Sequence, residues 1–263
     1  MVKGEVPLIF FICFALNLVI FFLLWIYQEI YKNASYVDVA WSMTILLQAG
    51  LYFWWFEGHS VYASLSLFLV ALWALRLTWH LMRRLVGEPE DSRYAKLRHK
   101  WGESSSRNFF WVHLMNAAVS FLMALSLVPL MSHQGPLYAF LYLGFGLGVL
   151  AVSGEALADR QLREFKGQRE NQGQVLDRGL WRYSRHPNYF FEWLHWVAYG
   201  VMAFGLEWGW VSFLGAVVIY IFLTRITGVP FHQDKLKSAN PQYLAYVSRT
   251  PSFFPWFPRG QTK

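Results

Sequence analysis

Residues 171–193 gather the side-chain types that bind phosphate and move protons. Three arginines fall close together, and each guanidinium can hold a phosphate through two parallel hydrogen bonds; they are Arg178, Arg182 and Arg185. Pro187 follows and favours the start of a helix. Glu192 then falls inside an apolar run, where an ionisable side chain indicates function by default. The segment therefore predicts an anion-binding site above the start of a membrane helix.

Residues 87–102 form a second charged segment, in which acidic residues alternate with arginines in a turn rich in Gly and Pro. A loop that only marks membrane topology needs cations and has no need of Glu90 and Asp91. Ion pairing can fix arginine side chains and leave their forks aimed at phosphate. The alternative interpretation is a solvated charged loop, or a basic surface that attracts anionic lipid.

A few charges lie within or next to apolar runs: Asp38, Arg76, His80, Glu155, Asp159 and Arg225. Asp38 would face lipid only at substantial cost, so we expect it to point into a helix bundle. Its structural alternative is a helix cap or a partner of a cytoplasmic arginine. Asp159 and Arg163 stand four residues apart, which by itself is an ordinary helix ion pair.

The elements that must position these residues are membrane helices. The chain of 263 residues is 56% hydrophobic, 19% aromatic and only 15% charged, against about 25% charged in soluble domains. A membrane helix needs roughly 20 mostly apolar residues. Seven segments meet or approach this length: Pro7–Tyr27, Val37–Phe56, Val61–Leu81, Phe109–Met131, Pro136–Ser153, Tyr189–Leu206 and Trp208–Thr224. We therefore predict an all-α membrane protein with a bundle of about seven transmembrane helices.

The connections between these segments alternate in charge. Those after the second, fourth and sixth segments have no Lys or Arg. Those after the third and fifth segments, and the C-terminal tail, carry nearly all of the cations. By the positive-inside rule the N-terminus lies outside and the C-terminus in the cytoplasm. We expect an integral protein of a bacterial inner membrane whose active site faces the cytoplasm, with residues 251–258 packed as an ordered tail.

Several function classes are excluded by what the chain does not carry. Cys13 is the only cysteine, so the chain has no internal disulfide and no thiolate metal site. The motifs of nucleotide-binding loops, zinc peptidases and serine hydrolases are missing. The net charge of +7 is explained by topology, so we expect no nucleic-acid partner and no metal. Residues 1–263 are predicted to form a single membrane domain.

Four motifs in order resemble a known family. They are the run 179–190 (GLWRYSRHPNYF), the element 90–94 (EDSRY), the element 224–230 (TRITGVP) and the tail with Tyr243, Tyr246 and 251–253 (PSF). Together they look like the DUF1295 group, which is similar to the steroid 5-alpha-reductases of the same membrane superfamily. The motifs concentrate in 83–102 and 155–263. The Arg-His-Pro-Asn-Tyr element also occurs in membrane methyltransferases.

The resemblance implies a seven-helix bundle in which NADPH reduces a carbon–carbon double bond conjugated to a carbonyl. The substrate would be a lipophilic small molecule from the bilayer, and membrane lipids would be the other partners. Asp38 and Glu192 are the expected catalytic residues. The residues expected to bind the cofactor are Asp91, Arg93, Tyr94, Arg98, Asp159, Arg163, Asn171, Arg178, Tyr183, Arg185, His186, Asn188, Tyr189, Arg225, Tyr243 and Tyr246.

Two rival functions stay open. One is a methyltransferase that uses S-adenosylmethionine on a membrane lipid or prenylated substrate. Its cofactor carries no phosphate, so it has less need of convergent arginines. The other is a membrane protein without enzymatic activity that binds lipid.

Overall fold

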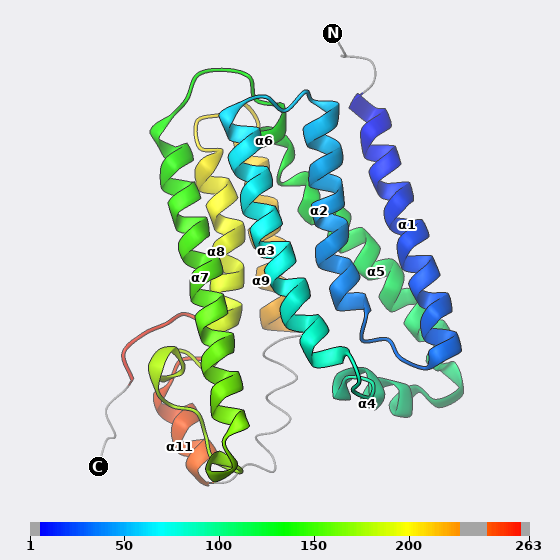
Figure 1. Cartoon of the computed structure of the whole chain (residues 1–263), viewed down its shortest axis with the longest axis vertical. Coiled ribbons are helices and arrows are strands. Elements are labelled where there is room, and N and C mark those ends of the chain that lie inside the picture. Colours follow the sequence, from blue (N-terminus) through cyan, green and yellow to red (C-terminus); the bar gives the residue numbers. More distant parts are fainter. Residues whose placement is uncertain (1–5, 227–240, 259–263) are drawn as a thin grey trace.

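The computed structural model describes residues 6–226 and 241–258, and within these ranges it contains helices and turns but no strand. Seven helical rods run along the long axis of the molecule (Figure 1). They are α1 (Val6–Tyr31), α2 (Val37–Trp55), α3 (Val61–Leu85), α5 (Ser105–Leu125), α7 (Ala139–Gly167), α8 (Pro187–Met202) and a last rod built from η4 (Gly209–Phe213), α9 (Leu214–Ile221) and η5 (Phe222–Ile226).

Shorter helices lie at the ends of these rods. α6 (Val128–Ser132) lies at the end where the chain begins (Figure 1). At the opposite end are α4 (Ser92–Trp101) and α11 (Pro241–Arg249). The remaining short helices are η1 (Gly102–Ser104), η2 (Arg169–Asn171) and η3 (Gly179–Arg182). We refer to the end that carries α4 and α11 as the basic end, because the arginine-rich connections lie there.

Five stretches are long and apolar enough to cross a membrane: Pro7–Tyr31, Val61–Leu85, Ser92–Leu125, Ala139–Gly167 and Gly209–Ile226. They correspond to five of the seven predicted segments. The two others are also helical, but α2 carries Asp38 and Gln48 among its apolar residues, and α8 has only 16 residues. At 1.5 Å per residue α8 is about 24 Å long, shorter than the hydrocarbon core of about 30 Å. The chain is thus an all-helical protein with several helices able to span a bilayer.

Two predicted boundaries were wrong. The segment Phe109–Met131 is interrupted, because α5 ends at Leu125 and α6 begins only at Val128. Pro129 follows this break, and a proline cannot donate the backbone hydrogen bond that would continue α5. The segment Pro136–Ser153 begins at Ala139 and continues as α7 to Gly167. Hydropathy marks where a helix leaves the bilayer, whereas the helix itself continues into the charged residues that follow.

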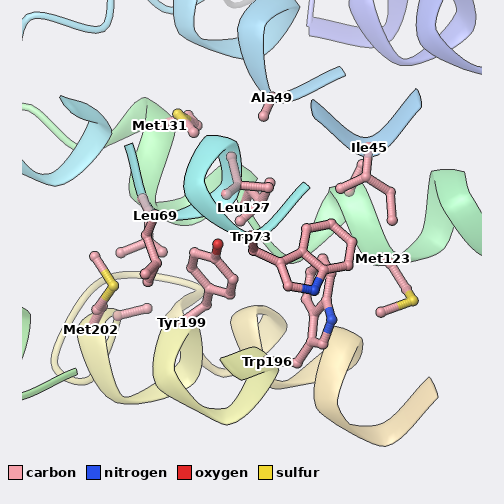
Figure 2. Close-up of a cluster of buried hydrophobic side chains, with 14 of the residues drawn as sticks. Ile45, Ala49, Leu69, Trp73, Met123, Leu127, Met131, Trp196, Tyr199 and Met202 are labelled. Carbon is pink, nitrogen blue, oxygen red and sulfur yellow. The ribbon is translucent and has the colours of Figure 1, made fainter. Parts of the chain in front are cut away.

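Aromatic side chains fill the centre of the bundle. Trp73 of α3 and Trp196 of α8 are fully buried, and their rings meet edge to face with centroids 5.3 Å apart. Figure 2 shows both indoles among Ile45, Met123 and Leu127, which come from α2, from α5 and from the turn after α5. The high aromatic content of the chain is therefore used for packing between helices as well as for contact with lipid.

Helices α7 and α8 approach each other closely at small residues. A Cβ atom on Gly144 would lie 2.5 Å from the backbone nitrogen of Met202 and 2.7 Å from the carbonyl oxygen of Ala198. One turn further, Gly148 admits the side chain of Leu69 from α3. Glycines four residues apart permit such backbone contact between membrane helices. This contact fixes α8, whose first turn belongs to the motif at 179–190, against α7.

Gly144→Val is expected to lower the free energy of unfolding by about 1–3 kcal/mol, the usual cost of overpacking. Thermal unfolding of the detergent-purified protein measures it. Gly146→Val is the matched control, because a Cβ at Gly146 meets no atom within 4 Å. Equal melting temperatures for the two variants would contradict the close approach of α7 and α8.

Candidate functional site

The motif at 183–186 holds the C-terminal tail. Ser184 Oγ donates to the carbonyl of Phe253 at 2.8 Å, and the backbone N–H of Arg185 donates to the carbonyl of Pro251 at 2.9 Å. His186 Nδ1 lies 2.8 Å from the carbonyl oxygen of Ser252. The buried hydroxyl of Tyr246 donates to the carbonyl of Trp181 at 2.5 Å. The tail is ordered as predicted, and its role here is to hold the start of α8.

Asp38 joins α2 to α4. Its Oδ2 accepts a hydrogen bond from Arg93 Nη2 at 2.7 Å, and its Oδ1 accepts one from the hydroxyl of Tyr94 at 2.8 Å. Tyr94 is buried, while the side chains of Asp38 and Arg93 keep about a third of their surface exposed (28% and 37%). Asp38 is thus the partner of a basic-end arginine, which was the structural alternative at this position.

Asp91 caps the start of α4 and closes the same network. Its carboxylate accepts hydrogen bonds from the backbone N–H and from Nε of Arg93, at 2.9 and 3.0 Å. Burial alone would raise the pKa of Asp91, but the hydrogen bonds and positive charge of Arg93, with Arg84 nearby, outweigh it and lower the pKa. We call Asp38, Asp91, Arg93 and Tyr94 the α4 network.

Arg98 makes several structural contacts. It donates to both carboxylate oxygens of Glu90, at 3.1 and 2.8 Å, and to Gln28 Oε1 at 3.0 Å. Its guanidinium lies over the ring of Phe109, 4.6 Å from the centroid. Glu90 also accepts the backbone N–H of Ala34. Arg98 therefore clamps α4 onto the α1–α2 turn through Nε and Nη2.

A second set of charges lies deeper, where α3, α7 and α8 meet. Arg76 of α3 forms ion pairs with Glu155 and Asp159 of α7. Asp159 Oδ1 also accepts a hydrogen bond from Asn188 Nδ2 at 3.1 Å, and His80 Nδ1 lies 3.7 Å from Asp159 Oδ2. Both carboxyl side chains are more than nine-tenths buried. We call Arg76, His80, Glu155, Asp159, Asn188 and Glu192 the buried charge chain.

Glu192 is the deepest member of this chain. Its Oε2 accepts the indole N–H of Trp73 at 2.8 Å, and its Oε1 accepts that of Trp196 at 3.1 Å. The two indoles lie side by side in Figure 2. Trp73 also stacks on the imidazole of His195, with centroids 5.3 Å apart and planes inclined by 16°. Glu192 is held in place by two uncharged hydrogen-bond donors.

Tyr189 connects the two groups. It lies within electrostatic range of Arg93 and Asp38 in the α4 network and of Asp159 in the buried charge chain. Its ring stacks on His186, with centroids 5.3 Å apart and an interplanar angle of 2°. The first two turns of α8 therefore lie beside both networks.

Other predicted cofactor residues lie outside these networks. Arg163, Arg178 and Arg225 are exposed on α7, before η3 and on η5, and Tyr183 packs against Phe257. Asn171 donates to the carbonyl of Phe165 and to Gln168, so it organises the turn after α7. Tyr243 lies beside Tyr246 on α11. Residues 227–230, the remainder of the motif at 224–230, lie outside the described residues.

Three partners in the buried charge chain were not predicted as site residues: Arg76, His80 and Glu155. The sequence carried a signal for Arg76, because an arginine in the middle of an apolar helix requires a buried acidic partner. It gave no signal that Trp73 and Trp196 would bind Glu192. Among the residues that the structure describes, no group of three or more His, Cys, Asp or Glu is arranged to hold a metal ion.

Asp91→Asn keeps a capping oxygen on α4 but removes the charge that pairs with Arg93. Because the pKa of Asp91 is lower in the folded than in the unfolded state, the pair stabilises the fold at neutral pH. That contribution is lost as the pH falls through the folded-state pKa. At pH 7 the variant should lose about 1–2 kcal/mol, in the range of a hydrogen bond to a charged group. The difference from the unmodified protein should shrink under acid.

Denaturant unfolding at several pH values measures this effect. Glu88→Gln, at an exposed position of the same turn, is the control and should have little effect. A deficit of Asp91→Asn that stays constant down to acid pH would contradict the charge pairing.

Comparison with known proteins places the chain in a family. Residues 24–250 match the model described as "Protein of unknown function (DUF1295)". The chain is also similar to the uncharacterized protein C594.04c of Schizosaccharomyces pombe, with 24% identity over 260 residues, covering 85% of this chain and 73% of the relative. No solved structure matches significantly. The family match includes the α4 network, the buried charge chain and α11, and the chain belongs to the DUF1295 family.

Proposed function

We propose that this protein is a membrane-embedded reductase that uses NADPH to reduce a carbon–carbon double bond conjugated to a carbonyl in a lipophilic substrate. The resemblance of the four motifs to the steroid 5-alpha-reductases suggested this function. The structural observation that carries it is the order of polar groups at the start of α8. Arg185 precedes the helix, the amide of Asn188 lies in its first turn, and the carboxyl of Glu192 lies one turn further along it.

In the proposed topology all seven rods cross the membrane, with the N-terminus outside and the basic end in the cytoplasm. With seven crossings the first and last rods point in the same direction. α8 can cross despite its length, because the turns on either side continue its path and a bilayer thins locally around a short helix. A cofactor from the cytoplasm would reach the start of α8 directly.

The residues at this place fit a dinucleotide. Arg185 Nε is buried without a hydrogen-bond partner, so it is a free donor for phosphate. The N-terminus of the 16-residue helix α8 adds favourable potential for an anion. Asn188 can both donate to and accept from a carboxamide, and Glu192, four residues on, lies on the same face of the helix. The order of Arg185, Asn188 and Glu192 along the chain matches NADPH, which has a negatively charged pyrophosphate and an uncharged reduced nicotinamide.

When bound, NADPH supplies the hydride. The chain itself would contribute hydrogen-bond donors that stabilise the negative charge developing on the carbonyl oxygen of the substrate. Tyr94 is the candidate donor in the α4 network: its ring is buried, and its hydroxyl, which donates to Asp38 in this structure, would turn from Asp38 to the carbonyl oxygen when the substrate binds. The apolar faces of the helices would let the substrate come from the bilayer.

Two other functions compete with this proposal. A methyltransferase would use S-adenosylmethionine, which has no phosphate for Arg185 to bind. A protein that only binds lipid would use neither cofactor. All three agree with membership of the family, so ligand binding must separate them.

Thermal unfolding of the purified protein with NADPH, NADH or S-adenosylmethionine makes this separation. A ligand at 100 times its dissociation constant should add about 2.7 kcal/mol of stability. We expect stabilisation by NADPH, and we expect Arg185→Ala to weaken it about 10- to 100-fold, since a hydrogen bond to a charged group contributes about 1.5–3 kcal/mol.

Arg107→Ala, an exposed arginine on α5 at the same end of the bundle, is the control and should bind NADPH as the unmodified protein does. Stabilisation by S-adenosylmethionine alone would overturn the reductase in favour of a methyltransferase. No shift with any cofactor would leave lipid binding as the function.

A further inference from the structure

The contact between Glu155 and Glu192 is the one polar contact in the buried charge chain that lacks a donor. The two carboxyls come from α7 and α8, and both residues are about 95% buried. Asp159 of α7 meets Asn188 of α8, and Gly144 meets Met202, so the two helices run antiparallel. Glu155 and Glu192 each lie four residues from the Asp159–Asn188 contact, on the same faces, and therefore lie opposite each other. Oε2 of Glu155 has no hydrogen-bond donor in the part of the chain that the structure describes. Two ionised carboxylates offer only acceptors to each other.

The neighbouring groups supply too little positive charge to stabilise two carboxylates there. Within residues 6–226 and 241–258, Arg76 is the only guanidinium that forms an ion pair with the carboxyls of the buried charge chain, and Asp159 already pairs with it. Asp159 is further satisfied by Asn188 and lies near His80. Arg76 Nη1 lies 2.6 Å from Oε1 of Glu155 but without the geometry of a hydrogen bond. Arg76 is thus one permanent cation for the three carboxyls of Glu155, Asp159 and Glu192.

The surroundings of Glu192 provide donors without charge. Both of its oxygens accept indole N–H groups, from Trp73 and Trp196, which lie at the centre of the bundle (Figure 2). Tyr199 is the other titratable group within electrostatic range on α8. Arg84 and Arg163 also act electrostatically on His80. Like charges in an apolar interior cost several kcal/mol unless a proton or a partner compensates them.

We propose that Glu155 and Glu192 share one proton at neutral pH and form an acid site inside the membrane part of the bundle. The proton lies between Oε2 of Glu155, which has no other donor in the described part of the chain, and the carboxyl of Glu192, so that one carboxyl always supplies the donor that the other lacks. With one shared proton, the three carboxyls of Glu155, Asp159 and Glu192 carry two negative charges in total. Arg76 balances one of them, and His80 balances the other when its imidazole is protonated. The site does not depend on NADPH, so it goes beyond the proposed function and stands or falls separately from it.

Infrared spectroscopy of the purified protein tests this directly. A protonated carboxylic acid gives a C=O stretching band that is distinct from that of a carboxylate and shifts in D2O. We expect this band at neutral pH and expect it to disappear in both Glu155→Gln and Glu192→Gln. In either variant the amide N–H replaces the shared proton as donor to the remaining carboxylate, so the fold should be retained.

Glu170→Gln, at an exposed position in η2, is the control and should leave the band unchanged. Trp73→Phe provides a second test, because it removes one donor from Glu192 and keeps both carboxyls. It should shift the band without removing it. A band that is missing from the unmodified protein, or that persists in both glutamine variants, would overturn the proposal, whatever the outcome of NADPH binding.

Discussion

The ion pairs of Arg76 are the interaction on which the arrangement of the site depends. A guanidinium in the middle of an apolar helix must have an acidic partner, because removing one member of a buried pair costs about 3–5 kcal/mol. Arg76 binds Glu155 and Asp159 of α7, and Asp159 receives Asn188 of α8. One side chain of α3 thereby sets the rotation of α7 and, through α7, of α8. The glycine contact between α7 and α8 fixes their separation, and the ion pairs fix which faces meet.

With α8 set in this way, its first turn becomes the meeting point of three parts of the chain. The C-terminal tail holds the turn before it through Ser184, Arg185 and His186. The α4 network reaches it through Tyr189. The deep carboxyls lie one turn further in. A site assembled from segments so distant in sequence requires each helix to be positioned by contacts outside the site, and the Arg98 clamp on α4 and the tail on α8 provide them.

Sequence reasoning succeeded where a rule needs only local information. Apolar length identified the helices, the mixed charge of 87–102 identified a structured segment, and Pro187 marked the start of α8. The rules were insufficient where the outcome depends on which faces of two helices meet. Arg98 and Arg163 are both arginines near the membrane, yet one is clamped by Glu90 and the other is exposed. Nothing in the spacing of either residue distinguishes them. The partners of Arg76 and of Glu192 also come from other helices, and only the packing of α3, α7 and α8 brings them together.

The α4 network and the buried charge chain differ in their balance of positive and negative charge. We therefore expect them to respond differently to salt and to pH. In the α4 network Asp38 and Asp91 face Arg93, with Arg84 nearby, so the charges nearly cancel at a partly exposed rim. Salt weakens such pairs, and their contribution to stability is modest. In the buried charge chain three carboxyls face Arg76 where water and ions have little access. Screening by salt cannot correct an imbalance there, whereas a bound proton can. The exposed rim should therefore respond to ionic strength and to anionic ligands, and the buried interior to protons.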